Sequence, residues 1–294
     1  MKIYSGLNNT YCLKSILPIL LLFAFEQCHA QNLVPNPSFE EHSSCPSNLQ
    51  QIAHVIDWAE YTPSPDYFNF CAGQSSAGVP SNMFGFQYPA TGSGYIGLLT
   101  YYEESWGSYN SREFAGAELL DPLEVGSTYY VSLKVSASGL SEDIWPNSGS
   151  NNLGVWFTSN PSLSNTNNLS QVYSVNIITD TLGWQVIQGE FIADSNYTHI
   201  VLGNFFEDSL TDAILLYNQS WTNHIASYYY IDDVCVSREQ STCVQTTSIN
   251  NIPKPEKKLL RIVDLMGKDT EEKNNTLLIY IYNDGSRTKI YRQE

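Results

Sequence analysis

Residues 127–136 read STYYVSLKVS, a stretch in which apolar and polar side chains alternate. Tyr129, Val131, Leu133 and Val135 fall on one side of an extended chain, and the intervening, mostly polar residues fall on the other. Successive side chains of a β-strand point to opposite faces of its sheet. The pattern therefore predicts a strand with one face in a hydrophobic core.

Similar short runs recur along the chain, whereas helical periodicity is nearly absent after residue 30. We predict further strands at residues 94–100, 153–158, 171–178, 183–193, 199–205 and 228–236. Turn-forming residues, such as Pro122, Gly126 and Pro161, separate these runs. Many strands with polar connections predict an all-β fold, an antiparallel β-sandwich over residues 31–238.

The charge of the chain is unevenly distributed. Residues 31–253 hold 22 Asp and Glu against three Lys and Arg, a net charge of −19, whereas residues 254–294 hold nine basic and seven acidic residues. This reversal predicts two units, which we place at residues 31–238 and 256–294, with a linker at residues 239–255. Because an acidic surface repels phosphate backbones, nucleic acid is excluded as an expected partner.

The first thirty residues have the pattern of a secretory signal peptide. Lys2 and Lys14 precede an apolar run at residues 16–25, and Cys28-His29-Ala30 places small residues where a signal peptidase cleaves. The alternative is a lipoprotein acylated at Cys28, but Gln27 is large for that signal. We expect a signal peptide at residues 1–30 and no transmembrane span in the mature chain, since no later run reaches about 20 apolar residues.

Cleavage after residue 30 would leave four cysteines, Cys45, Cys71, Cys235 and Cys243. Four cysteines in an exported chain allow three pairings. Adjacent pairing, Cys45 with Cys71 and Cys235 with Cys243, closes the shortest loops and is the one we expect. None of the pairs has the spacing of metal ligands, which favours disulfides over a zinc site.

The last forty residues carry the most specific motif of the chain. Residues 259–268 read LLRIVDLMGK, residues 278–285 read LIYIYNDG, and Lys289 follows. This pattern resembles the short form of the type IX secretion system C-terminal sorting domain. The resemblance implies a small β-meander that directs export through the periplasm of a Gram-negative bacterium to the outer cell surface or the medium, with the type IX secretion machinery as partner. The alternative is an ordinary β-hairpin tail of the main domain.

Two segments at opposite ends of the main unit carry a second resemblance. Residues 32–40 read NLVPNPSFE and residues 229–234 read YYIDDV, and they resemble the opening and closing strands of galactose-binding-like jelly rolls. Residues 84–97 also recur in secreted proteins of this kind. The resemblance implies a jelly-roll sandwich, a fold that hosts carbohydrate-binding modules, adhesin modules and spacer domains.

In carbohydrate-binding jelly rolls, a structural calcium often joins the first strand to the last through a glutamate and an aspartate. The matching residues here are Glu40 and Asp232, and Asp233 is a further candidate ligand. Clustered acids that meet in the fold repel one another unless a cation lies between them, and calcium prefers six to eight oxygen ligands. The alternative is that Asp232 and Asp233 end a strand and accept hydrogen bonds from a neighbouring turn.

Candidate ligand-binding residues lie in three predicted loops that combine aromatic and polar side chains. They are Tyr101, Tyr102, Trp106, Trp145 and Trp221. Aromatic rings stack on the C–H faces of sugars, while nearby carboxylates and amides bond the hydroxyls. The alternative is that these rings fold back and cover the edge of the sandwich.

Catalytic motifs are scarce. The sequence has no paired metal-binding histidines, no G-x-S-x-G elbow and no phosphate-binding loop. Glu103 and Glu104 are adjacent, so on a strand they would point apart. We therefore predict a secreted, non-catalytic, glycan-binding protein. A structural or adhesive surface protein that binds another protein is the alternative, and a secreted glycoside hydrolase is a more distant one.

Overall fold

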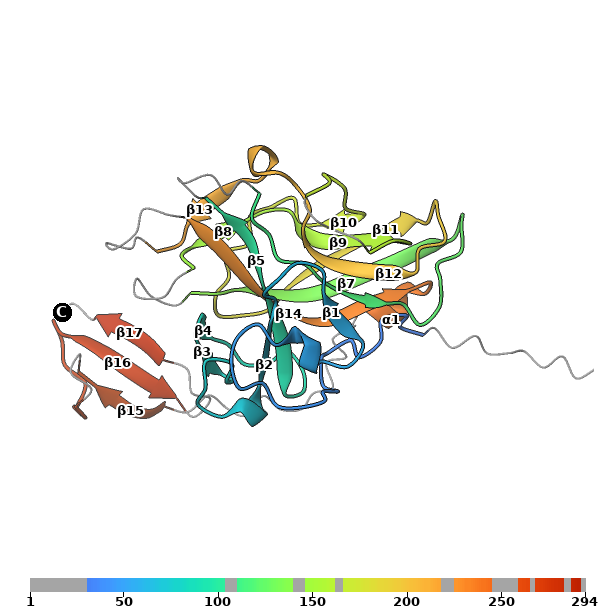
Figure 1. Cartoon of the computed structure of the whole chain (residues 1–294). Helices are drawn as coiled ribbons and strands as arrows, with labels where there is room; N and C mark the ends of the chain where they lie inside the picture. The colour runs from blue at the N-terminus through green and yellow to red at the C-terminus, as the bar shows by residue number, and fades with distance from the viewer. Residues whose placement is uncertain are drawn as a thin grey trace, which may run out of the picture. The chain divides into compact units, whose positions relative to one another are not determined.

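The computed structural model describes residues 31–103, 110–139, 146–161, 166–217, 225–244, 259–264, 268–282 and 287–291 (Figure 1). The chain divides into two compact units, Met1–Thr242 and Cys243–Glu294. No helix of these described residues is long and apolar enough to cross a membrane.

The first unit is an antiparallel jelly-roll β-sandwich. One sheet has the order β1 (Trp58–Glu60), β6 (Ala115–Glu118), β12 (His199–Asn204), β9 (Leu153–Thr158), β10 (Val172–Tyr173). The other has the order β11 (Gln185–Ile192), β7 (Thr128–Ala137), β14 (Ala226–Ser237), β5 (Gly94–Tyr102), β2 (Asp66–Asn69). At one end of this second sheet, β8 (Ser148–Ser150) pairs in parallel with β14 and antiparallel with β13 (Ala213–Leu215). The all-β prediction is confirmed.

The alternation of residues 127–136 decides which side chains enter the core. Tyr129, Val131, Leu133 and Val135 are at most 2% exposed and lie in the main hydrophobic cluster. That cluster also holds residues of β9 and β12, such as Phe157, so it fills the space between the two sheets. This arrangement is the sandwich packing that the sequence predicts.

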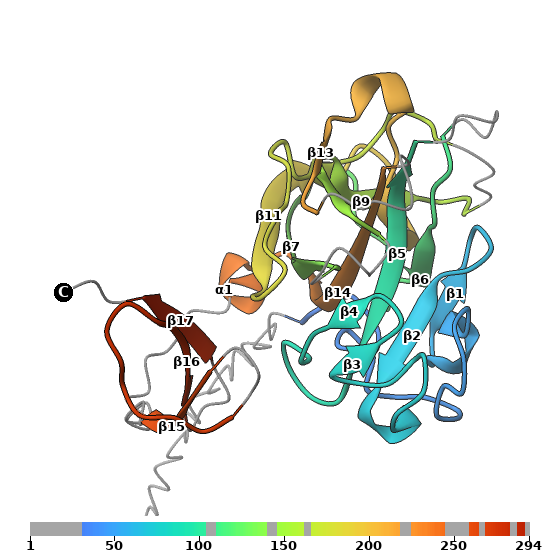
Figure 2. The same ribbon diagram turned by 90° about the vertical axis from the view of Figure 1, so that its left-hand side faces the viewer.

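The seven-stranded sheet is buried on its other face as well. Phe68, Tyr95, Tyr228 and Tyr230 form a second cluster there, under residues 77–86. This covering segment contains the hairpin β3 (Ser81–Asn82) and β4 (Gly85–Phe86), which Figure 2 shows beside β2 and β5. Burial on both faces explains why residues 228–231 of β14 read YYYI without polar alternation.

The opening segment of the sandwich is not a strand, which corrects our prediction for residues 32–40. Pro35 and Pro37 lack the N–H that a ladder requires, and Asn36 and Phe39 have positive φ angles of 41° and 59°. The segment still runs beside the last strand of the sandwich, β14. The Asn32 side chain donates to Val234 O at 2.9 Å and accepts from Val236 N at 2.9 Å, in addition to backbone bonds from Leu33 N to Val236 O at 2.7 Å and from Val234 N to Pro37 O at 2.9 Å.

Other boundaries differ modestly from the predicted ones. The strand expected at residues 153–158 is observed as β9, whereas the one expected at 171–178 shortens to the two residues of β10. The short strands β1, β2, β6, β8 and β13 were not predicted. Short helical turns are η1 (Ile52–His54), η2 (Phe70–Ala72), η3 (Asp208–Leu210) and α1 (Gln240–Cys243), the last within the predicted linker.

The second unit is a three-stranded antiparallel meander. It has the order β15 (Leu259–Val263), β16 (Leu277–Tyr282), β17 (Arg287–Tyr291), with Val263, Leu278 and Tyr280 buried. Beyond β15, Lys268 N donates to Asp264 Oδ1 at 3.0 Å. The predicted β-meander is confirmed, and residues 283–286, between β16 and β17, lie outside the described residues.

A buried phenol offers a test of this core. The Tyr229 hydroxyl lies 2.8 Å from Ile178 O and accepts from Ser150 N at 2.6 Å, so Tyr229→Phe leaves both groups without this partner. We expect the variant to lose about 1–3 kcal/mol of unfolding free energy, measured by urea denaturation. Tyr173→Phe, at an exposed tyrosine of β10, is the control and should change it little. Equal stability of both variants would contradict this role of Tyr229.

Candidate functional site

A bulge in the last strand of the sandwich positions two of the predicted site residues. The β14–β7 register shifts between Asp232 and Cys235, and Asp233 has a positive φ of 50°. Asp232 is fully buried, and its Oδ2 accepts from Ala90 N at 2.8 Å and from Thr91 N at 3.1 Å. The Asp233 backbone N–H donates to Asp232 Oδ1 at 2.7 Å.

The other two acids of the predicted calcium site are held by the same part of the chain. Asp233 Oδ2 lies 2.6 Å from Lys134 Nζ, and its Oδ1 accepts from the hydroxyls of Ser38 and Thr91. Glu40 Oε1 accepts from the backbone N–H groups of residues 93 and 94 at 2.8 and 3.0 Å. Residues 90–94 therefore bind both ends of the sandwich, and we call them the clamp loop.

The candidate calcium ligands have protein hydrogen-bond donors in this structure. The carboxylates of Glu40, Asp232 and Asp233 accept from N–H and O–H donors, and the ammonium of Lys134 lies beside Asp233. Within the described ranges, the three acids do not gather into one group of potential metal ligands. These hydrogen bonds are those of the alternative, in which the aspartates accept from a neighbouring turn, and calcium binding stays a prediction.

The surroundings shift the pKa values of these two aspartates in opposite directions. Burial, assisted by the negative charge of Asp233, raises the pKa of Asp232 to about 8 against the opposing effect of its backbone hydrogen bonds. Burial also acts to raise the pKa of Asp233. The hydrogen bonds from Lys134, Ser38 and Thr91, together with the Lys134 charge, outweigh burial and lower the pKa of Asp233 below its ordinary value.

A second pair of buried acids lies beneath the covering segment and the end of β5. Asp66 accepts from Gln50 N at 2.6 Å and from the Tyr228 hydroxyl, and burial raises its pKa to about 6. Glu113 accepts from Leu99 N at 2.7 Å and from a serine hydroxyl, and burial raises its pKa to about 8. Asp66 is 2% exposed and Glu113 is 9% exposed, so both acids are buried.

The predicted ligand-binding loops are anchored side by side at one end of the seven-stranded sheet. Tyr102 pairs with Ala226 at the start of β14, and Glu103 N donates to Ile225 O at 2.8 Å. Asn147 N, just before β8, donates to Ala226 O at 3.1 Å. Figure 1 shows β8, β13 and the end of β5 together there. We call this region the loop end.

The structure places only two of the five predicted ligand residues. Tyr101 and Tyr102 are half-buried at the end of β5. The guanidinium carbon of Arg112 lies 5.3 Å from the centroid of the Tyr101 ring, and Arg112 Nη2 lies 2.8 Å from Asp208 Oδ1. The remaining candidates, Trp106, Trp145 and Trp221, lie outside the described residues.

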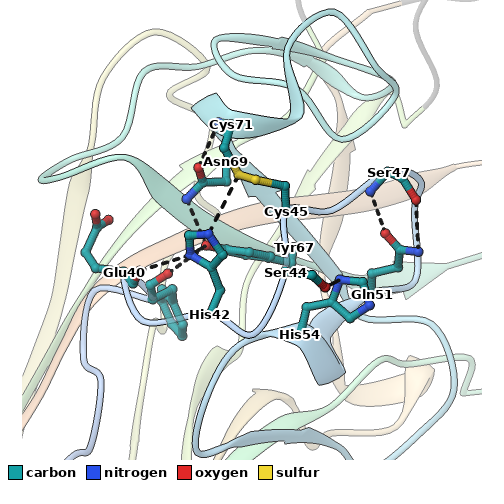
Figure 3. Close-up of a disulfide and its surroundings, with 11 residues drawn as sticks. Glu40, His42, Ser44, Cys45, Ser47, Gln51, His54, Tyr67, Asn69 and Cys71 are labelled. Carbon is teal, nitrogen blue, oxygen red and sulfur yellow. Dashed lines mark hydrogen bonds between the residues drawn. A yellow bond between two sulfur atoms is a disulfide. The ribbon is translucent and has the colours of Figure 1, made fainter.

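The pairing of Cys45 with Cys71 is confirmed, with Cα atoms 5.7 Å apart (Figure 3). Cys235 and Cys243 are disulfide-bonded too. His42 approaches the first disulfide, with Nε2 3.8 Å from Cys71 Sγ and Nδ1 3.2 Å from the Tyr67 hydroxyl.

His42, Cys45 and Cys71 form the sole group of three potential metal ligands in the described part of the chain. Both sulfurs belong to a disulfide and are not thiolates, so this group is a covalent link rather than a zinc site.

Sequence analysis missed three exposed aromatic residues that lie together. Tyr88 lies between Phe70, at 6.4 Å between ring centroids, and Phe86, at 5.5 Å. We call these three side chains the aromatic row. Residues 84–87 were noted only as a fold signal, and Phe70 is eighteen positions away from Tyr88, so no local pattern joined them.

Comparison with known proteins gives no family. No protein-family model and no curated protein matches the chain. Solved structures match at 10–13% identity, a level at which similarity concerns the fold alone.

Three of these structures are as follows. The xylanase 10B CBM22-1–GH10 modules of Clostridium thermocellum, complexed with xylohexaose, have 13% identity over 71% of this chain and 29% of theirs, at a TM-score of 0.35. The K1 cleaved adhesin domain of Lys-gingipain from Porphyromonas gingivalis W83 has 12% identity over 68% of this chain and 94% of its own, at 0.34. A putative sugar-binding protein from Bacteroides thetaiotaomicron VPI-5482 has 10% identity over 71% of this chain and 100% of its own, at 0.34.

The raised pKa values predict how stability depends on pH. An unfolded chain releases the protons of Asp66, Glu113 and Asp232 near pH 4, whereas the folded chain keeps them until about pH 6–8. The unfolded state thus binds fewer protons in this window, so stability falls as pH rises from about 4.5 to 8. We expect a melting temperature several degrees lower at pH 8.5 than at pH 5.5, measured by calorimetry.

Glu113→Gln is the matched variant for this prediction. The amide oxygen can still accept from Leu99 N, but the side chain no longer titrates, so the loss between pH 5.5 and 8.5 should be smaller. Two results would contradict the raised pKa values. One is a wild-type melting temperature that rises from pH 5.5 to 8.5, and the other is a Glu113→Gln melting temperature that falls as much as that of the wild type.

Proposed function

We propose that this protein is an exported, non-catalytic, glycan-binding protein. The observation that carries the proposal is the loop end, where the three aromatic-bearing loops begin or finish on adjacent strand ends beside Tyr101 and Arg112. Loops held by a rigid sheet are a common way to build a binding surface. The absence of catalysis is proposed because the buried acids Asp66 and Glu113 accept hydrogen bonds from the protein's own groups.

The expected ligand is a neutral glycan. The three basic residues of residues 31–253 are all in ion pairs: Arg112 with Asp208, Lys134 with Asp233, and Arg238 with Glu124. With a net charge of −19 over the same residues, an anionic sugar would meet repulsion without a cation to bind it.

The test of ligand binding uses the full mature chain on an array of neutral and acidic glycans. We expect binding to neutral glycans, and at least a tenfold loss in the triple variant Trp106→Ala, Trp145→Ala, Trp221→Ala. Tyr173→Ala, an exposed aromatic residue on β10 of the other sheet, should bind like the wild type. Lack of binding to any glycan would refute the proposal.

Export by the type IX route is supported by the sorting-domain motif and by the meander that residues 259–291 form. Deletion of residues 254–294 should leave the sandwich intact and retain it in the periplasm, as measured by immunoblots of cell fractions and medium. The full chain, expressed in the same strain, is the control. Truncated protein in the medium at the level of the full chain would argue against this route.

A further inference from the structure

The aromatic row is an unusual surface for a soluble sandwich. Phe70, Phe86 and Tyr88 are 43%, 45% and 57% exposed, and the Tyr88 ring contacts the rings of the other two. Single exposed apolar residues are common, but a group of exposed rings marks a contact surface.

The backbone on both sides of each ring is fixed. Phe70 N donates to Ser93 O at 3.0 Å, and the next residue, Cys71, is held by its disulfide. Gln87, between the other two rings, donates from its backbone N to Pro80 O at 2.8 Å and from its side chain to Ser136 Oγ at 2.6 Å.

The Trp184 indole donates to Tyr88 O at 2.9 Å and holds the backbone of the last residue of the row. The backbone that carries the three rings is thus fixed before any ligand arrives, which lowers the entropic cost of binding.

A groove of about 700 Å³ lies next to the backbone of the row. Its walls combine the polar residues Gln74, Ser75, Ser76, Ser81 and Asn82 with the apolar residues Val79, Pro80 and Met83. Backbone contacts join residues of these walls to the row at two points. Gly73, which lines it, donates from its backbone N to Phe70 O at 3.2 Å, and Ser81 pairs with Phe86 across the β3–β4 hairpin. None of the groove residues is charged.

We propose that the aromatic row and this groove form a second glycan-binding surface, which takes a neutral oligosaccharide. Its pyranose C–H faces would stack on the rings, while hydroxyls would bond the serine hydroxyls and the Gln74 amide of the groove. Since the groove combines uncharged polar residues with apolar ones, it matches a neutral ligand that has both hydroxyls and C–H faces better than a charged or purely apolar one. The inference rests on the proposed function, since it names a second place where the same class of ligand binds.

This surface is separate from the loop end. Phe70 contacts the backbone just before the start of β5 at Gly94, whereas the loop end lies at Tyr102, where β5 finishes. Strands rise about 3.3 Å per residue, so the nine residues of β5 place the two surfaces roughly 25 Å apart. Variants at one surface therefore leave the other unchanged.

The experiment measures binding of the full mature chain to soluble neutral polysaccharides, xylan, mixed-linked β-glucan and galactomannan, by affinity electrophoresis and calorimetry. Polygalacturonate is the charged comparison. The test variant is Phe70→Ala, Phe86→Ala, Tyr88→Ala. Tyr88→Phe keeps the ring, and Tyr173→Ala is the control for loss of an exposed aromatic residue. Thermal unfolding of each variant checks that the fold is retained.

We expect the row variant to lose at least tenfold in affinity for a neutral polysaccharide, while Tyr88→Phe and Tyr173→Ala bind as the wild type does. If only the loop-end tryptophan variant loses affinity, the second surface is refuted and the proposed function stands. If only the row variant loses affinity, the second surface stands and the loop end is refuted as the site. Wild-type protein that binds no polysaccharide, or binds polygalacturonate best, refutes the neutral-glycan surface.

If the triple variant fails to fold, Tyr88→Ser alone replaces it, since this side chain is the most exposed of the three. The results expected of the triple variant then apply to Tyr88→Ser. A protein partner that binds the wild type but not the row variant, without any sugar binding, would also overturn the inference.

Discussion

The bulge at Asp232 and Asp233 is the constraint on which the ends of the sandwich depend. It turns two adjacent carboxylates toward different partners, one toward the backbone of the clamp loop and the other toward Lys134 and Ser38. Because the clamp loop also binds Glu40, the opening segment, the start of β5 and the last strand are tied at one place. A jelly roll must bring its two ends together, and here fixed hydrogen bonds and one ammonium do so.

Burial of the seven-stranded sheet on both faces determines where a ligand can bind. The rings of Tyr95, Tyr228 and Tyr230 face away from the main core, but residues 77–86 cover them, so they serve packing. The exposed rings beside this cover are those of the aromatic row, Phe70, Phe86 and Tyr88. The cover is itself fixed to the sheet by hydrogen bonds from the Tyr230 hydroxyl to Asn82 Oδ1 and from Asn82 Nδ2 to the Tyr95 hydroxyl.

The negative charge of the sandwich favours the same class of ligand, a neutral glycan, at both proposed surfaces. The acidic residues of the sandwich far outnumber its basic ones, and each basic residue of residues 31–253 already has an acidic partner. In both proposals, binding therefore comes from stacking and neutral hydrogen bonds. The second unit has the opposite charge balance and its own small core around Val263, Leu278 and Tyr280, which agrees with a separate role in export.

The sequence by itself determined the features that depend on neighbouring residues. Alternation at residues 127–136 specified which side chains of β7 enter the core, and the shortest loop specified the partner of Cys45. The irregular opening segment follows from Pro35 and Pro37, a local signal that our strand prediction overlooked. Features that depend on distant residues came only from the tertiary structure, since the backbone donors to Asp232 Oδ2 belong to a loop about 140 positions away. The aromatic row likewise joins Phe70 to Phe86 and Tyr88 only through folding, because periodicity assigns a face to a side chain but not the neighbour that it meets there.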